Sequence, residues 1–65
     1  MRYQVGDIIR IDHMEGEPQY TGREGKIERI SKDCYGEIRF DGTWGGCAVY
    51  PMQDRFTVIK KGEQK

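Results

Sequence analysis

Residues 8–13 read Ile-Ile-Arg-Ile-Asp-His, and this alternating stretch decides the fold class. In an extended chain, Ile9, Ile11 and His13 share one face, and the polar residues between them share the other. A period of two with β-branched apolar residues is typical of a strand that buries one face. The stretch therefore predicts a β-strand, with His13 packed or hydrogen-bonded at its rim.

Four further short segments have strand character, and turn-forming residues separate them. In the first of them, Ile27 and Ile30 are three residues apart instead of two, which predicts a bulge or a sharp bend. Pro51 ends the third, because proline has no N–H for a ladder hydrogen bond, and residues 51–54 have the length of one 3₁₀ turn. The four segments are residues 25–30, 37–41, 47–50 and 56–59.

The five strands predict an all-β fold, a five-stranded and partly open barrel in one domain that spans residues 1–60. Residues 14–22 contain Pro and Gly without any periodicity, so we expect a long first loop there. Residues 61–65 are mostly charged and are expected to form a flexible tail. Each buried apolar side chain stabilises the fold by about 1.5–3 kcal/mol. The expected core is Val5, Ile9, Ile11, Ile27, Ile30, Ile38, Phe40, Val49, Phe56 and Val58.

The composition allows one small domain and argues against most catalytic chemistry. The 65 residues carry 11 Lys and Arg against 11 Asp and Glu, so the net charge is zero. No nucleophile, base or metal-binding motif is recognisable, so we predict that the protein is not an enzyme and has no cofactor. Cys34, Cys47 and His13 are together one ligand short of a structural zinc site, so no metal is expected.

The compartment is predicted from what the chain lacks. No run approaches the ~20 apolar residues that a membrane span needs, and the first seven residues lack the apolar core of a signal peptide. We therefore predict a cytoplasmic protein with reduced thiols and no membrane contact.

Asp12, Glu15 and Glu17 lack the dense alternating oxygen ligands of a calcium loop, so we expect them to be solvated.

Two motifs resemble the opening of KOW-type barrels, which are SH3-like. Residues 6–11, Gly-Asp-Ile-Ile-Arg-Ile, resemble the family's Gly-Asp-x-Val-x-Val strand, and residues 21–27, Thr-Gly-Arg-Glu-Gly-Lys-Ile, resemble its Gly-x-x-Gly-x-Val turn and strand. Together with residues 50–59, Tyr-Pro-Met-Gln-Asp-Arg-Phe-Thr-Val-Ile, they are similar to a family of short bacterial and phage proteins of unknown function. This resemblance covers residues 6–59 and implies an SH3-like barrel without implying an activity.

The first hypothesis for the function is an interaction module that docks a protein or peptide partner. The resemblance to SH3-like barrels implies that the long first loop, the second connection and the 3₁₀ turn lie near one another. Tyrosines there would give a large contact area at low entropic cost. Trp44 lies in a Gly-rich turn, and it either folds back over Phe40 or Tyr50 or stands exposed as an anchor. The candidate partner-binding residues are Tyr20, Tyr35, Trp44, Pro51 and Met52.

The alternative hypothesis is binding of nucleic acid, since KOW-like barrels often touch RNA, ribosomal proteins or RNA polymerase. Contacts with phosphates dominate such affinity, so the zero net charge and the interleaved Glu24 and Glu28 weaken this alternative. For the oligomeric state we expect a monomer or a weak homodimer that pairs through an edge strand. The candidate nucleic-acid-binding residues are Arg23, Lys26, Arg29, Lys32, Lys60 and Lys61.

Overall fold

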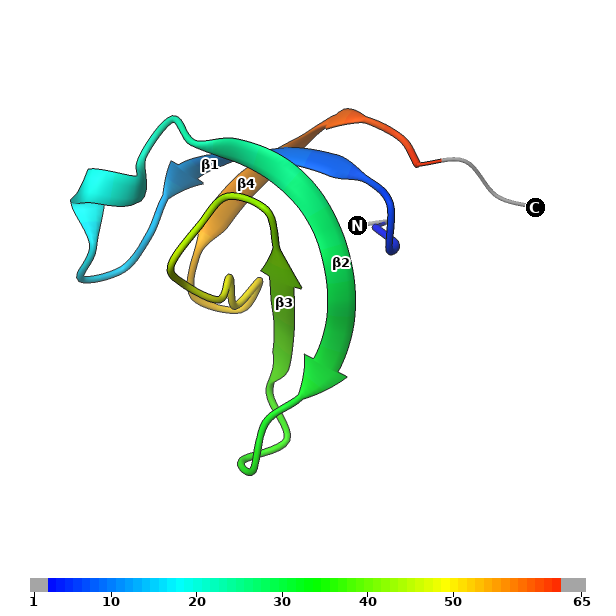
Figure 1. Cartoon of the computed structure of the whole chain (residues 1–65). Coiled ribbons are helices and arrows are strands. Elements are labelled where there is room, and N and C mark those ends of the chain that lie inside the picture. The colour runs from blue at the N-terminus through cyan, green and yellow to red at the C-terminus, as the bar shows by residue number, and fades with distance from the viewer. Residues whose placement is uncertain (1–2, 63–65) are drawn as a thin grey trace.

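The chain forms one antiparallel sheet of four strands, in the order β3-β2-β1-β4 (Figure 1). The computed structural model describes residues 3–62, and among them no helix is long and apolar enough to cross a membrane. The all-β prediction is confirmed for these residues. The elements are β1 (Ile8–His13), the 3₁₀ helix η1 (Pro18–Tyr20), β2 (Glu24–Lys32), β3 (Ile38–Gly42) and β4 (Arg55–Lys60).

The nine-residue strand β2 bends strongly and serves both halves of the sheet (Figure 1). Its first part pairs with β1, where Lys26 lies opposite Ile8, and its second part pairs with β3. The register with β3 shifts between Ile27 and Arg29, so the bulge predicted from the sequence is confirmed. A bulge increases local twist and bends its strand, and the sheet can therefore fold over its own concave face.

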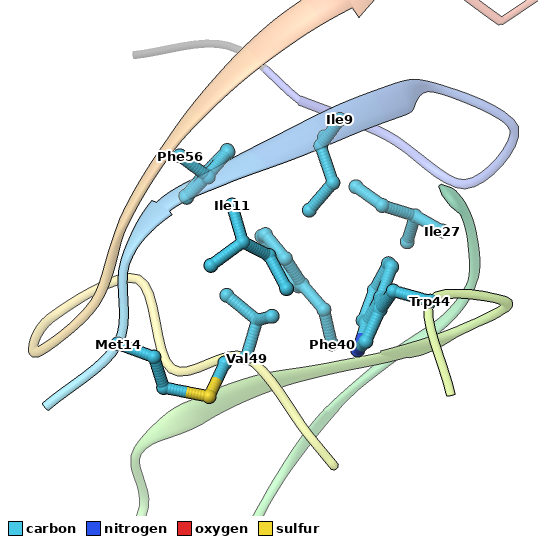
Figure 2. Close-up of a cluster of buried hydrophobic side chains, with 8 residues drawn as sticks. All are labelled: Ile9, Ile11, Met14, Ile27, Phe40, Trp44, Val49 and Phe56. Atoms are coloured by element: carbon cyan, nitrogen blue, oxygen red, sulfur yellow. The ribbon is translucent and has the colours of Figure 1, made fainter. Parts of the chain in front are cut away.

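This bend places the two outer strands of the sheet against one core (Figure 2). The rings of Phe40 from β3 and Phe56 from β4 meet edge to face, with their centroids 5.5 Å apart. Tyr3 packs on both rings, 4.7 Å from Phe40, and covers the core beside them. The buried apolar residues are Ile9, Ile11, Met14, Ile27, Phe40, Trp44, Val49 and Phe56.

Four predicted core residues lie outside this fully buried set. Ile30, Ile38 and Val58 are half-buried and pack against it. Val5 is 52% exposed, so its predicted burial is wrong. It precedes β1 in a turn, where the period of an extended strand does not apply.

The end of β1 also differs from the alternation seen in the sequence. The register between β1 and β4 shifts between Ile11 and His13, so the next inward side chain is Met14 instead of His13. Met14 is 3% exposed, and the His13 side chain is 57% exposed and lies 3.7 Å from Glu15. A packed or hydrogen-bonded His13 is therefore wrong, because an irregularity in the ladder reverses the faces.

The predicted strand at residues 47–50 is wrong. Only Val49 pairs, through two hydrogen bonds with Phe40 of 2.8 and 3.0 Å, and the described residues form four strands without a closed ladder. Tyr50 cannot continue a ladder, because its N–H donates to the Asp54 carboxylate (2.9 Å) and its carbonyl accepts from Gln53 (2.8 Å).

The predicted positions of the 3₁₀ turn and of the long loop also need correction. Residues 51–53 form a hydrogen-bonded turn, and the 3₁₀ helix observed among residues 3–62 is η1, inside the expected loop at 14–22. Pro18 at its first position explains this, because proline presets a helical φ and lacks the N–H that a first turn leaves unpaired.

The two ends of the described chain are fastened together by Asp7, whose side chain is fully buried. Its Oδ1 accepts a hydrogen bond from Gly62 N (2.7 Å), and its Oδ2 accepts from Gln4 N (2.9 Å) and from Lys61 Nζ (3.0 Å). Burial alone would raise the pKa of Asp7, but the hydrogen bond from Gly62, then those from Lys61 and Gln4, lower it below 3.8. Of the expected tail, Lys61 and Gly62 are thus held in place, and residues 63–65 lie outside the described residues.

Candidate functional site

Two of the predicted partner-binding residues are fully solvated on turns. Tyr35 is 86% exposed and Met52 is 81% exposed. Asp33 holds the turn that carries Tyr35, because its Oδ1 accepts hydrogen bonds from Tyr35 N (2.8 Å) and Glu37 N (3.0 Å). Gln53 donates to Glu37 (3.1 Å), so the turn at residues 50–54 is tied to the base of the same hairpin. This hydrogen bond joins the turn that carries the half-buried Pro51 and the exposed Met52 to the hairpin that carries Tyr35.

Tyr20 lies elsewhere, on η1, on the other side of the molecule from the turn between β2 and β3 (Figure 1). It is half-buried, and the Arg23 guanidinium stacks over its ring, 4.7 Å from the centroid. A Cβ at Gly46 would lie 3.2 Å from the Tyr20 hydroxyl. Tyr20 thus packs against the loop after β3, and the structure does not bring it together with Tyr35.

Trp44 is folded into the core and is only 3% exposed (Figure 2). Its Nε1 donates to the carbonyl of Cys47 (2.7 Å), and its ring lies in the core cluster with Phe40. A Cβ at Gly42 would overlap the indole, so this glycine makes room for the ring. Of the two alternatives for Trp44, exposure as an anchor is wrong.

A groove opens between β3, residues 46–50 and the loop at residues 14–17. Its volume is about 610 Å³, and it is open to solvent. Five carboxylates and one guanidinium line it, and that guanidinium, on Arg39, already pairs with Asp41 (2.9 Å). The lining residues are Glu15, Glu17, Glu28, Arg39, Asp41, Gly42, Gly46, Cys47, Ala48, Tyr50 and Asp54. We call this feature the acidic groove.

Asp54 fixes the two loops that border the acidic groove. It is 7% exposed, and its Oδ1 accepts from Glu15 N (3.1 Å) while its Oδ2 accepts from Tyr50 N (2.9 Å). Met14, next to Glu15, anchors the first loop in the core. Sequence reasoning missed Asp54, because an Asp in a turn usually accepts from N–H groups that follow it, whereas Asp54 accepts from residues that precede it.

Cys47 lies half-buried in the acidic groove. Burial raises the pKa of its thiol, the Glu17 and Asp54 carboxylates raise it further, and Arg23 partly opposes them. The thiol is therefore held in its protonated, weakly nucleophilic form. Both cysteines are free, and no three His, Cys, Asp or Glu side chains among the described residues are placed to hold a metal ion.

The six predicted nucleic-acid-binding residues fall into three places. Lys26, Lys60 and Lys61 line one open hollow of about 390 Å³ beside Ile8, whereas Arg29 and Lys32 line another hollow with three further charged residues. Arg23 is held apart from both, because its guanidinium covers Tyr20 and donates to the carbonyl of Trp44 (3.2 Å).

No family model, curated protein or solved structure matches the chain.

Proposed function

We propose that this protein is a small interaction module that docks a protein or peptide partner at the region of Tyr35, Met52 and the acidic groove. The observation that carries the proposal is the exposure of two large side chains on turns that are themselves fixed by hydrogen bonds. Met52 lies between Tyr50 and Asp54, which both line the acidic groove. We call Tyr35, Met52 and the acidic groove together the docking surface.

The physical argument is that preorganised side chains lose little freedom when a partner covers them. Asp33 orders the turn that carries Tyr35, and Asp54 orders the turn that carries Met52. Tyrosine contributes a large rigid contact area, and methionine adapts its shape to the surface that it meets. Both side chains are free to bind, since neither is needed to fill the core.

For the fold, we propose that the sheet is an SH3-like barrel left open at one seam. The bend of β2, the contact between the Phe40 and Phe56 rings and the pairing of Val49 with β3 support this assignment. In this assignment, residues 47–50 occupy the position of the barrel's fourth strand, and they pair with β3 only through the bridge between Val49 and Phe40.

The docking surface is tested by affinity capture from a lysate of the native host, with the wild type and two variants as bait. We expect the Tyr35→Glu, Met52→Glu double variant to lose a partner that the wild type retains. The control is Val5→Glu, which makes the same kind of change at an exposed apolar residue on the turn before β1, outside the docking surface, and it should capture that partner normally. Equal capture by both variants, or no capture by the wild type, would refute the proposal.

A second candidate function is RNA binding through Lys26, Lys60 and Lys61, because no carboxylate lines the hollow that they share. Lys61 is already paired with Asp7, which weakens this candidate. If the three lysines neutralise phosphates of single-stranded RNA, log K should fall with log salt at a slope of about −2. Lys26→Glu should then abolish binding, whereas a slope near zero excludes this function.

A further inference from the structure

We propose that the partner presents a cationic, extended segment, rich in lysine or arginine, that lies in the acidic groove. The inference rests on the proposed function and specifies the chemistry of its partner. Tyr35 and Met52 would supply contact area at one end of the docking surface, and the carboxylates would select the segment.

The charge of the acidic groove is the first argument. Five carboxylates against one guanidinium leave a net charge of −4, although the chain as a whole is neutral. Within the described residues the Glu28 side chain makes no hydrogen bond or ion pair, and the Glu17 carboxylate accepts only from the Gln19 amide at 3.4 Å. An occupant without positive charge would desolvate these carboxylates without compensating them.

The shape of the acidic groove is the second argument. Small residues, Gly42, Gly46, Cys47 and Ala48, line it beside the half-buried Tyr50. A pocket for a small molecule usually buries most of its ligand, whereas this groove is open to solvent. An extended chain can lie on the backbone of the small residues while its long side chains reach the carboxylates at the borders.

The distribution of charge over the molecule is the third argument. Lys26, Lys60 and Lys61 gather at a different hollow, so no lysine lines the acidic groove. The separation leaves a local negative field that steers a cationic segment toward the groove. Glu17 and Asp54 act on Cys47 in the sense expected of such a field, since both raise the pKa of its thiol.

The two parts of the docking surface are expected to contribute differently to the free energy of binding. Exposed ion pairs each contribute little to the free energy of binding, so the carboxylates alone would bind a peptide weakly. Buried contact with an aromatic side chain is commonly worth more at an interface. The cationic segment is therefore recognised by the acidic groove and retained by Tyr35 and Met52.

The test is a titration of the ¹⁵N-labelled full chain with hexaarginine, compared with hexaglutamate, at 0.15 M salt. We expect amide shifts at Gly42, Gly46 and Ala48 with hexaarginine only. Glu28→Lys should weaken the binding at least about fivefold, because it places like charges together. Glu24→Lys is the matched control, since it makes the same charge change on β2 outside the groove, and it should change Kd less than twofold.

Three outcomes would overturn the inference: no binding, shifts that lie outside the acidic groove, or equal weakening by Glu24→Lys and Glu28→Lys. If one of them occurs while capture still depends on Tyr35 and Met52, the proposed function stands with a partner of other chemistry. If hexaarginine binds in the acidic groove while capture does not depend on Tyr35 and Met52, the groove remains a site for cationic segments and the proposed docking surface is refuted.

Discussion

Asp7 and Asp54 are the two buried carboxylates of the described chain, and they fasten opposite parts of it. Asp7 binds Gly62, which is 55 residues away, and so ties the end of the chain to its beginning. Asp54 binds Glu15, 39 residues away, and ties together the two loops that border the acidic groove. The first carboxylate stabilises the sheet, and the second fixes the borders of the acidic groove, which belongs to the proposed docking surface. The same arrangement, a buried carboxylate that accepts from backbone N–H groups, thus joins the two ends of the described chain at one site and two loops at the other.

The largest expected effect is that of Asp7→Ala. The change removes a fully buried carboxylate and leaves the N–H groups of Gln4 and Gly62 without their acceptor. We expect a loss of about 3–5 kcal/mol, because each unpaired N–H group costs about 1–3 kcal/mol and the exposed Lys61 ammonium loses at most about 1 kcal/mol of attraction. Such a loss would remove most of the stability of a domain this small.

Urea unfolding followed by the fluorescence of the buried Trp44 measures this loss. If Asp7→Ala does not fold, Asp7→Asn provides a second value, since its remaining oxygen can still accept from Gly62. A loss below 1 kcal/mol in both variants would show that Asp7 does not fasten the chain ends.

The next effect is that of Asp54→Ala, which we expect to destabilise the fold by about 2 kcal/mol. Two backbone N–H groups, of Glu15 and Tyr50, lose their acceptor, and an unpaired group costs about 1–3 kcal/mol. Unlike Asp7→Ala, this variant should stay folded and lose partner capture, because the borders of the acidic groove are released. Normal capture by the folded variant would show that Asp54 has no part in binding and contributes only to stability, as Asp7 does.

Neither aspartate could be assigned its role from the sequence, although much of the core could. Alternation placed Ile9 and Ile11 inside, and the three-residue spacing within 25–30 revealed the bulge of β2. Those patterns are local, so the order of neighbouring residues is enough to predict which side chains of a strand face the core. The hydrogen bonds from Gly62 to Asp7 and from Glu15 to Asp54 join residues far apart in the chain, and no local period encodes them.

The wrong predictions come from individual contacts that the period of a strand does not encode. Residues 47–50 have the composition of a strand, but Asp54 takes the N–H of Tyr50 that a ladder would need. Trp44 lacks a strand period, yet the absence of a side chain at Gly42 gives its ring a place in the core. For the site, the sequence predicted that Tyr35 and Met52 lie on turns, where the structure leaves them exposed, whereas the separation of Tyr20 depends on how η1 packs.

A smaller effect is expected in acid. The pKa of Asp7 lies below 3.8 in the folded chain, so its contribution to stability is complete above the unfolded value and is lost as the pH falls through the folded pKa. Urea midpoints measured from pH 6 downward should therefore fall more steeply below about pH 4 in the wild type than in Asp7→Asn. The pKa of Asp12 is also lowered, by the Thr57 hydroxyl and by Arg10, so part of the acid loss should persist in Asp7→Asn. Parallel curves would show that Asp7 does not cause the difference.

The smallest effect is expected from Lys61→Ala. This change removes the ammonium that donates to Asp7 and keeps the two backbone N–H donors, so it measures the contribution of the ion pair alone. The Lys61 side chain is 56% exposed, so solvent screens its attraction for the carboxylate. Asp7 would keep its hydrogen bonds from Gly62 and Gln4, and we expect a loss of less than about 1 kcal/mol. Lys60→Ala is the matched control, since Lys60 makes no ion pair among the described residues, and it should leave the urea midpoint unchanged. A loss from Lys61→Ala as large as that from Asp7→Ala would mean that the ion pair, and not the backbone N–H groups, fastens the ends of the chain.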